Sequence, residues 1–174
     1  AIECLTAALN VDRNWPVEEF LNLAQGGEEV LGGHNADWFI HYTTMSHYEK
    51  LRPLLLQMLK SASEKVRKVA ASRITVAALH EKAPESDLAE VLRVDAVCRT
   101  AAAHIFSDGL GYDPVRDKCR EHLKNLFHDP EKAVRDMTDH CFRKLSDEQL
   151  AKESELITAF INSNAFADDA AQLC

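Results

Sequence analysis

Residues 127–142 read FHDPEKAVRDMTDHCF, and residues 59–74 read LKSASEKVRKVAASRI. The dipeptide Val134-Arg135 in the first stretch repeats Val66-Arg67 in the second, 68 residues earlier (135 − 67), and Arg99 follows Cys98 close to midway between them. Self-similarity with a period near 34 residues is typical of stacked helical pairs. These stretches therefore predict an all-α chain built from repeated two-helix units.

Apolar residues keep the same offsets from the three arginines. They fall one residue before each arginine, two or three after it and seven after it, which is one face of an α-helix. A second apolar stripe precedes each of these helices. Neither stripe can be buried within one unit, so neighbouring units must stack. The residues that we expect in the core are Leu59, Val69, Ile74, Leu92, Phe106, Phe127 and Phe142.

The pattern resembles the HEAT family of repeats, in which the turn between the helices often reads Asp-Pro-x-x-x-Val-Arg. Residues 129–135, DPEKAVR, match this pattern at each of its four specified positions. The first unit has Ser61 in place of the aspartate, and the second has Arg93. The resemblance covers residues 48–145 and implies an α-solenoid, or superhelix, of antiparallel helix pairs of the HEAT/armadillo type. HEAT repeats occur in scaffolds, transport receptors and a few enzymes, so the fold alone does not select a function.

We expect the chain to form a single continuous domain in three parts. Residues 1–47 supply N-terminal helices that pack on the array, 48–145 supply three HEAT-like helix pairs, and 146–174 supply a capping helix and tail. A length of 174 residues is sufficient for a substantial core. Because the chain begins with Ala1 and not with methionine, we expect it to be a fragment of a longer protein.

Two further segments carry a second resemblance. Residues 51–55, LRPLL, with residues 58–61, MLKS, are similar to the C-terminal helical region of large bacterial signal-transducing ATPases of the STAND type, and so are residues 157–163, ITAFINS, with Ala165-Phe166. That resemblance implies the sensor or scaffold region of a larger protein, with nucleotide hydrolysis located in another module. This chain contains no Walker motif of its own.

The charge balance narrows the choice of partner. Twenty basic residues face twenty-eight acidic ones, for a formal charge of −8, and residues 146–174 carry six acids and one base. Proteins that grip phosphate backbones usually have the opposite sign. A basic cluster exists at helical spacing, and we interpret it as a solvated helix face: Lys65, Arg67, Lys68 and Arg73. Nucleic acid is therefore not the expected partner.

The cysteines and the hydropathy indicate the compartment. The five cysteines are an odd number without paired short spacing, and Cys98 and Cys141 fall on the predicted core faces. This usage is typical of a reducing cytoplasm. No stretch approaches eighteen apolar residues and no signal peptide opens the chain, so we expect no membrane association and a cytoplasmic location.

No group of residues in the sequence demands a reaction. Cys119 and His122 lie three apart, as two metal ligands on one helix would, but a structural zinc needs four ligands. His80-Glu81 is similar to the His-Glu pairs of HEAT-repeat metal hydroxylases, a family that needs several such pairs. We therefore assign no catalytic, metal-binding or cofactor-binding residue, and no cofactor. The alternatives are a metal-dependent or hydrolytic enzyme that uses His80, Cys119 and His122, and a nucleic-acid-binding HEAT-like module.

The densest aromatic and histidine cluster lies ahead of the repeats. Its members are Trp38, His41, Tyr42, His47 and Tyr48. Such a cluster is either a groove for a ligand or peptide, or a wide core-facing stripe with tyrosines and histidines at its edges. We interpret it as the stripe.

Together, these patterns favour a non-catalytic helical-repeat scaffold that binds a protein partner in the bacterial cytoplasm. The sequence leaves open the identity of the partner, the face that binds it and the oligomeric state.

Overall fold

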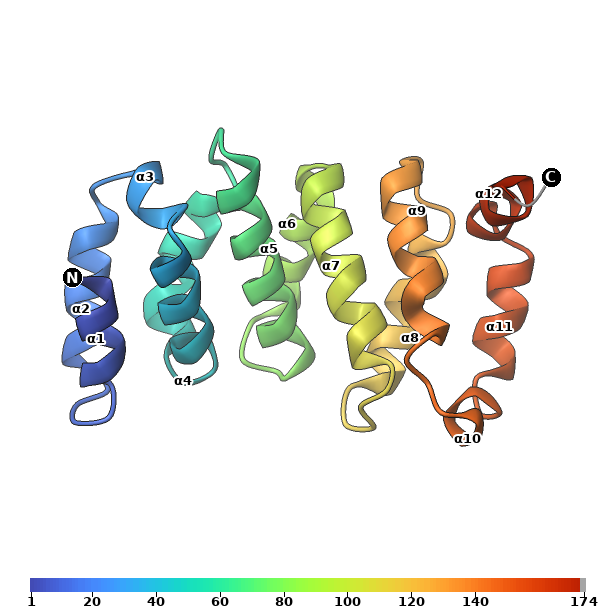
Figure 1. The fold of residues 1–174 in the computed structure, drawn as a ribbon, viewed down its shortest axis with the longest axis horizontal. Coiled ribbons are helices and arrows are strands. Elements are labelled where there is room, and N and C mark those ends of the chain that lie inside the picture. Colours follow the sequence, from blue (N-terminus) through green and yellow to red (C-terminus); the bar gives the residue numbers. More distant parts are fainter. Residues whose placement is uncertain (173–174) are drawn as a thin grey trace. The chain divides into compact units, whose positions relative to one another are not determined.

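The computed structural model describes the backbone of residues 1–172 and the side chains of residues 1–168. Within this part of the chain there are twelve α-helices and one 3-10 turn and no β-strand, which confirms the predicted all-α class (Figure 1). The chain divides into two compact units: unit 1 is Ala1–Val94, and unit 2 begins at Asp95. The boundaries predicted at residues 47 and 145 do not coincide with this division, and the three-part organisation stays a prediction.

Unit 1 contains six helices. They are α1 (Ile2–Ala8), α2 (Trp15–Ala24), α3 (Glu28–Leu31), α4 (His34–Met58), α5 (Glu64–Leu79) and α6 (Glu85–Val94). Helix α1 packs on α2 and α4, α4 packs on α5, and α5 packs on α6. The rings of Phe20 and Phe39 are fully buried and stack with centroids 4.5 Å apart, which fixes α2 against the first half of α4.

Helix α4 is two helices joined by a kink. His47 has non-helical angles (φ −133°, ψ 29°), and the hydroxyl of Ser46 lies 2.8 Å from its Nδ1. The half before the kink packs among the N-terminal helices, and the half after it carries the first predicted apolar stripe. The predicted start of the repeats at residue 48 thus falls directly after the kink.

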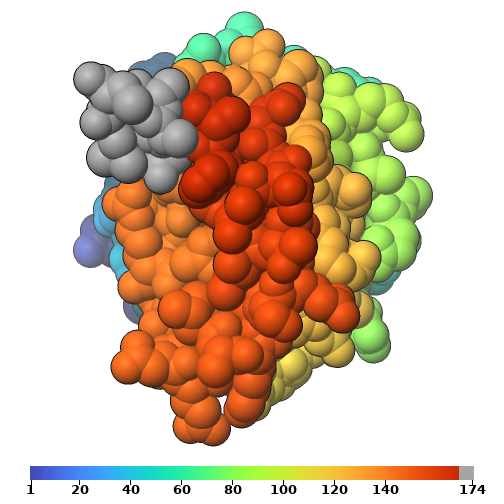
Figure 2. All heavy atoms as spheres, turned by 90° about the vertical axis from the view of Figure 1, so that its right-hand side faces the viewer, coloured from blue at the N-terminus to red at the C-terminus, as the bar shows by residue number. Residues whose placement is uncertain are grey.

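Unit 2 contains α7 (Ala96–Gly109), α8 (Arg116–Leu126), α9 (Lys132–Asp139), the 3-10 turn η1 (His140–Phe142), α10 (Asp147–Leu150), α11 (Ser154–Ile161) and α12 (Asn164–Gln172). Helix α9 packs against both α7 and α12, while α8 packs against α7 and α11. Figure 2 shows the outer surface at the C-terminal end of this unit, where α11 and α12 (red) lie in front of the orange segment that includes α9. The second predicted helical pair, α6 and α7, is divided between the two units.

Four of the seven residues predicted to be core are fully buried, and three are not. Leu59, Ile74, Phe106 and Phe127 expose 1% of their surface or less. The prediction is wrong for Val69, Leu92 and Phe142, which are only half-buried. Val69 and Leu92 occupy the edges of their helical stripes. Phe142 is displaced because α9 ends at Asp139 and the chain continues as a 3-10 turn.

Because the repeated arginines stand near the start of a helix, their position in the sequence predicts structural contacts with acceptors of the preceding turn or of a neighbouring helix end. Two of the three, Arg67 and Arg135, bind turn carbonyls. Nη1 of Arg67 donates to the carbonyl oxygens of Ser61 and Ala62, and Nη1 of Arg135 donates to those of Asp129 and Pro130, at 2.6–3.0 Å. Both arginines therefore tie the start of their helix to the preceding turn, six and five residues back. These carbonyls belong to turn residues outside both helices, so the arginine supplies a hydrogen-bond donor that the helices do not.

The sequence also predicts Asp129, in the turn before α9, as the partner of Arg135. This prediction is correct for the backbone of Asp129 and wrong for its carboxylate. The buried carboxylate of Asp129 accepts two hydrogen bonds from Arg99, at 2.6 and 3.2 Å. Nε of Arg135 instead donates to Asp168 on α12, at 2.6 Å. Both repeated arginines of unit 2, Arg99 and Arg135, thus bind an acid about one repeat further along the chain, which links helices that are distant in the sequence.

Candidate functional site

Large exposed hydrophobic side chains are concentrated before residue 48. Among the described residues, nine such side chains are exposed, and six of them lie in this segment: Val11, Trp15, Leu23, Trp38, Tyr42 and Met45. Single exposed apolar residues are ordinary, whereas a group of them marks a binding surface. We therefore place the candidate site in the N-terminal part of unit 1.

The first half of α4 has two opposite apolar faces. Phe39 and Ile40 are completely buried in the core of unit 1. Trp38 and Tyr42, four residues apart on the other face, are 43% and 57% exposed. Because residues at i and i+4 lie one above the other on a helix, the two rings stack, with centroids 5.5 Å apart and planes 25° apart. The result is a flat aromatic surface in contact with solvent.

Neighbouring histidines hold this aromatic surface in place. Nε1 of Trp38 donates to Nε2 of His34 at 2.6 Å, and His41 meets the edges of both rings at centroid distances of 5.8 and 5.3 Å. On the other side His41 contacts Arg73, whose Nη2 also donates to Asp37 at 2.5 Å. Contacts on both sides restrict the rotamers of the aromatic rings, so the surface is formed before any ligand arrives.

The interpretation of this cluster as a core-facing stripe is correct only in part. Tyr48 is buried, and its hydroxyl donates to Asp87 at 2.7 Å. Trp38, His41 and Tyr42 instead face solvent, because α4 kinks at His47 and the two halves bury different faces. The position of Trp38 and Tyr42 opposite Phe39 and Ile40 in the sequence was a signal for this outcome.

A groove of about 670 Å³ runs beside the aromatic surface between α1 and α4. Its walls are one face of α1 with the loop that follows it and one face of α4. The lining side chains are Glu3, Thr6, Ala7, Leu9, Asn10, Arg13, Asn35, Trp38, Tyr42, Thr43, Ser46 and His47. This volume is within the range of sites that bind small ligands or short peptide segments.

Several polar groups at the edge of the groove are available to a ligand. Within residues 1–168, the guanidinium of Arg13, the amides of Asn10 and Asn35, the hydroxyl of Tyr42 and the carboxylate of Glu3 have no recorded side-chain hydrogen bond or ion pair. Arg13 was not predicted from the sequence, because a single arginine in a loop has no pattern that distinguishes it. Only the fold brings it to the groove.

Two histidines near the site, His41 and His47, have a pKa that is lower than usual. Burial, together with Arg73, lowers the pKa of His41 below its usual value. Burial, with Lys50 and Arg13, does the same to the pKa of His47. Arg13 and Glu3 are therefore the charged groups of the groove lining itself.

The three residues on which the enzyme alternative depends, His80, Cys119 and His122, make packing and capping contacts within their own units. Cys119 is fully buried, and burial raises the pKa of its thiol to about 12, so it is protonated at pH 7. The ring of His122 stacks on Phe106, with centroids 4.5 Å apart. His80 is the C-cap of α5 and belongs to unit 1, whereas Cys119 and His122 lie on α8 of unit 2. Within the described residues, no three His, Cys, Asp or Glu side chains are grouped so that they could hold a metal ion.

The basic cluster on α5 is solvated only in part. Lys65 and Lys68 are exposed, as predicted. Arg67 instead binds the turn carbonyls described above, and Arg73 pairs with Asp37. Two of the four cations are thus engaged within unit 1.

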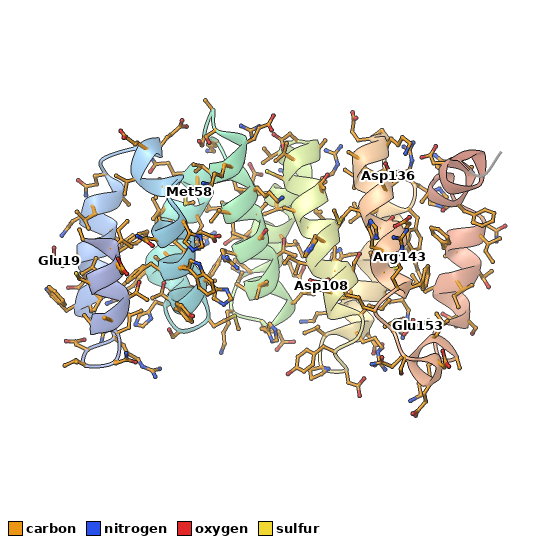
Figure 3. The ribbon with its side chains drawn as sticks, viewed as in Figure 1. Glu19, Met58, Asp108, Asp136, Arg143 and Glu153 are labelled. Atoms are coloured by element: carbon orange, nitrogen blue, oxygen red, sulfur yellow. The ribbon has the colours of Figure 1, made fainter. Side chains whose placement is uncertain are left out.

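A second pair of equivalent arginines was not predicted from the sequence. Arg52 and Arg120 stand 68 residues apart (120 − 52), as Arg67 and Arg135 do, and each makes two parallel hydrogen bonds to a buried carboxylate. Arg52 binds Asp87, and Arg120 binds Glu153, which is the N-cap of α11 and is labelled in Figure 3. A search for arginines at constant offset from Arg67 and Arg135 would have found them.

Comparison of the chain with protein-family models, with curated proteins and with solved structures gives no match in any of the three. In the part of the chain that the structure describes, no helix is both long and apolar enough to span a membrane. The case for a function therefore rests on the groove and on the helical packing.

Proposed function

We propose that this chain is a non-catalytic, HEAT-like helical-repeat scaffold whose groove between α1 and α4 binds a protein partner. Packing within unit 2 supports the repeat architecture, because α9 lies between α7 and α12 while α8 packs on α11. Two rows of helices related in this way are what an α-solenoid of antiparallel pairs requires. The arginine contacts to turns and to acids one repeat away support the same architecture.

One observation carries the binding function. The Trp38 and Tyr42 rings are stacked, held by neighbours and about half exposed beside a groove of about 670 Å³. Leaving two large rings in water forgoes the free energy of burying them, which is about 1.5–3 kcal/mol for a large side chain. Aromatic residues also dominate the hot spots of protein interfaces. A partner that covers these rings recovers that free energy.

The resemblance to STAND-type ATPases extends the proposal to a larger protein. In that arrangement, this cytoplasmic bacterial array is the sensor or scaffold region, and the nucleotide-binding module lies elsewhere. Its test is to find a phosphate-binding loop motif in the gene that encodes the chain.

The binding function is tested with a displayed library of random peptides. We compare enrichment on the wild-type chain with enrichment on the double variant Trp38→Ala/Tyr42→Ala, after confirming that both have the same circular dichroism. We expect the wild type to enrich peptides that the double variant does not retain. If no peptide is enriched, or if the double variant retains the same peptides, the groove is not a protein-binding site.

The matched control is Trp15→Ala. Trp15 is 50% exposed but lies on α2, outside the residues that line the groove. We expect this variant to retain the enriched peptides. Loss of binding in this variant as well would indicate nonspecific adhesion to exposed tryptophans.

A further inference from the structure

Resting on the proposed function, we infer that protonation of His41 controls the aromatic surface formed by Trp38 and Tyr42. The neutral imidazole holds the two rings in place, and the imidazolium releases them together with the partner that covers them. The inference comes from the hydrogen bond that His41 accepts, from the charged groups that face it and from its contacts with both rings.

The contact between His41 and Arg73 requires a neutral imidazole. Nη1 of Arg73 lies 3.0 Å from Nδ1 of His41. A guanidinium can only donate and stays protonated in proteins, so Nδ1 is the acceptor and the ring carries its single proton on Nε2. Protonation of His41 puts a hydrogen on Nδ1, which removes the acceptor and brings two positive charges together. His41 therefore makes this contact only in its neutral form.

The charged groups around His41 favour that neutral form. Among the described residues, two of them face the ring: Arg73 from α5, and Asp37 from the preceding turn of α4. The carboxylate of Asp37 already accepts from Nη2 of Arg73, at 2.5 Å. Burial, followed by the charge of Arg73, lowers the pKa of His41 below 6.5, and Asp37 opposes this shift only in part. The surface should therefore change at mildly acidic pH.

His41 supplies contacts that the core of unit 1 does not. Its ring centroid lies 5.8 Å from that of Trp38 and 5.3 Å from that of Tyr42, with interplanar angles of 86° and 69°. Both aromatic rings are about half exposed, so packing against the core does not fix them. When the imidazolium leaves Arg73 for water, both rings gain rotational freedom. Ordering them again then costs the partner conformational entropy, which weakens binding.

The first test measures the fluorescence anisotropy of Trp38 against pH. Trp15 and Trp38 are the two tryptophans of the chain, so Trp15→Phe leaves Trp38 as the only emitting indole. His34→Gln is added, because an amide oxygen can accept the indole hydrogen bond in place of Nε2 and does not titrate. We expect the anisotropy to fall on acidification in one transition with a midpoint below pH 6.5, while far-UV circular dichroism stays constant.

Four further substitutions in this background separate a switch at His41 from general loosening. His41→Asn should abolish the transition, because the amide oxygen can replace Nδ1 as acceptor without titrating. Arg73→Gln should raise the midpoint and Asp37→Asn should lower it, because they remove opposite charges beside the imidazole. His47→Gln is the matched control and should leave the midpoint unchanged, since His47 lines the groove but contacts Ser46.

Three outcomes would overturn the inference. They are a transition that persists in His41→Asn, shifts of the same sign in Arg73→Gln and Asp37→Asn, and an anisotropy that rises on acidification. A rise would mean that the imidazolium binds the ring faces as a cation and orders them further.

The second test concerns release of the partner. Peptides enriched from the random library on the wild type at about pH 7.5 should be released at about pH 5, where an ordinary histidine is mostly protonated. The same peptides should stay bound to His34→Gln/His41→Asn at both pH values. Equal release from the two proteins would show that other groups cause it and would overturn the inference.

The two tests distinguish failure of this inference from failure of the proposed function. If the library enriches no peptide, the groove does not bind protein. The anisotropy transition requires no ligand, so it still decides whether His41 controls the aromatic surface.

Discussion

Residues 48–79 of unit 1 and residues 116–147 of unit 2 stand 68 positions apart and begin alike (116 − 48). Each opens with a helix whose arginine binds a buried acid, and each turn is closed by a second arginine. They differ at the end, because α5 runs for 16 residues whereas α9 stops after 8. The cause is composition: the end of α5 is rich in alanine, while Thr138, Asp139 and His140 form helices poorly.

The early end of α9 changes what the repeat buries. Ile74 and Phe142 occupy the same position of the repeat, yet Ile74 is completely buried and Phe142 is half-buried. The ring centroid of Phe142 lies 5.4 Å from that of Phe160 and 6.5 Å from that of Phe127, at the edge of an aromatic cluster. The sequence repeat therefore determines the type of residue at a position, whereas the length of the local helix determines how far that residue is buried.

The two acids differ as well. Asp87 lies in the first turn of α6 and accepts from Arg52 and Tyr48, whereas Glu153 is the N-cap of α11 and faces Arg120 and Arg116. Both acids are nearly inaccessible to solvent. The sequence repeats both acidic positions at the same offset, as ESDL at residues 85–88 and ESEL at residues 153–156, but Arg52 binds the second acid of its copy and Arg120 binds the first.

The largest expected effect tests the equivalence of Ile74 and Phe142. Ile74→Ala should cost about 3 kcal/mol of unfolding free energy, because it leaves a cavity in a fully packed site. Phe142→Ala should cost less than half as much, although it removes a larger side chain. Urea unfolding measures both, and Ile74→Val, at about 1 kcal/mol, is the graded control. An equal cost at the two positions would show that Phe142 is core.

The next effect tests the two acids. Glu153→Gln should lower the free energy of unfolding by about 3 kcal/mol, because it removes the negative charge that Arg116 and Arg120 both contact. The side chains of these arginines are only 14% and 22% exposed, so water cannot replace that charge well. Asp87→Asn should cost less than half of that, because Arg52 is 39% exposed and water can solvate it. Urea unfolding compares the two, and a larger loss for Asp87→Asn would reverse the comparison.

A smaller effect tests how the chain restarts after α9. Ser146 stands where α5 has Ala78, and it forms a capping box with Gln149 at the start of α10. Ser146→Ala should lower the free energy of unfolding by about 0.5–1 kcal/mol, because it removes the N-cap side chain. Ser154→Ala, at the first position of α11, is the control and should be neutral. Thermal unfolding with equal losses for the two variants would argue against the cap.

The smallest expected effect concerns pH. The hydrogen bonds from Arg52, with those from Tyr48, lower the pKa of Asp87 below its ordinary value of 3.8. Ionised Asp87 therefore stabilises the fold above that value, and this contribution is lost as the pH falls through the lowered pKa. The difference in unfolding free energy between wild type and Asp87→Asn should stay constant above about pH 5 and narrow below 3.8. A constant difference down to the acid transition would contradict the shift.

The sequence predicted the elements better than the surfaces. The period of about 34 residues located the helices of the repeats, and the offset of Arg67 and Arg135 predicted their contacts with turn carbonyls, because both depend on residues close in the chain. The exposure of Trp38 was not predicted. The sequence places Trp38 and Tyr42 on the helix face opposite Phe39 and Ile40, but only packing decides which of these two apolar faces is buried.

What the sequence determined by itself is local: helical periodicity, turn chemistry and the type of residue at each repeat position. Tertiary structure alone decided which carboxylate each arginine binds, that Phe142 lies at an edge, and that Arg13 stands beside Trp38 and Tyr42. The physical reason is that helix formation depends on neighbours within about four residues, whereas an ion pair or a groove depends on side chains that only packing brings together.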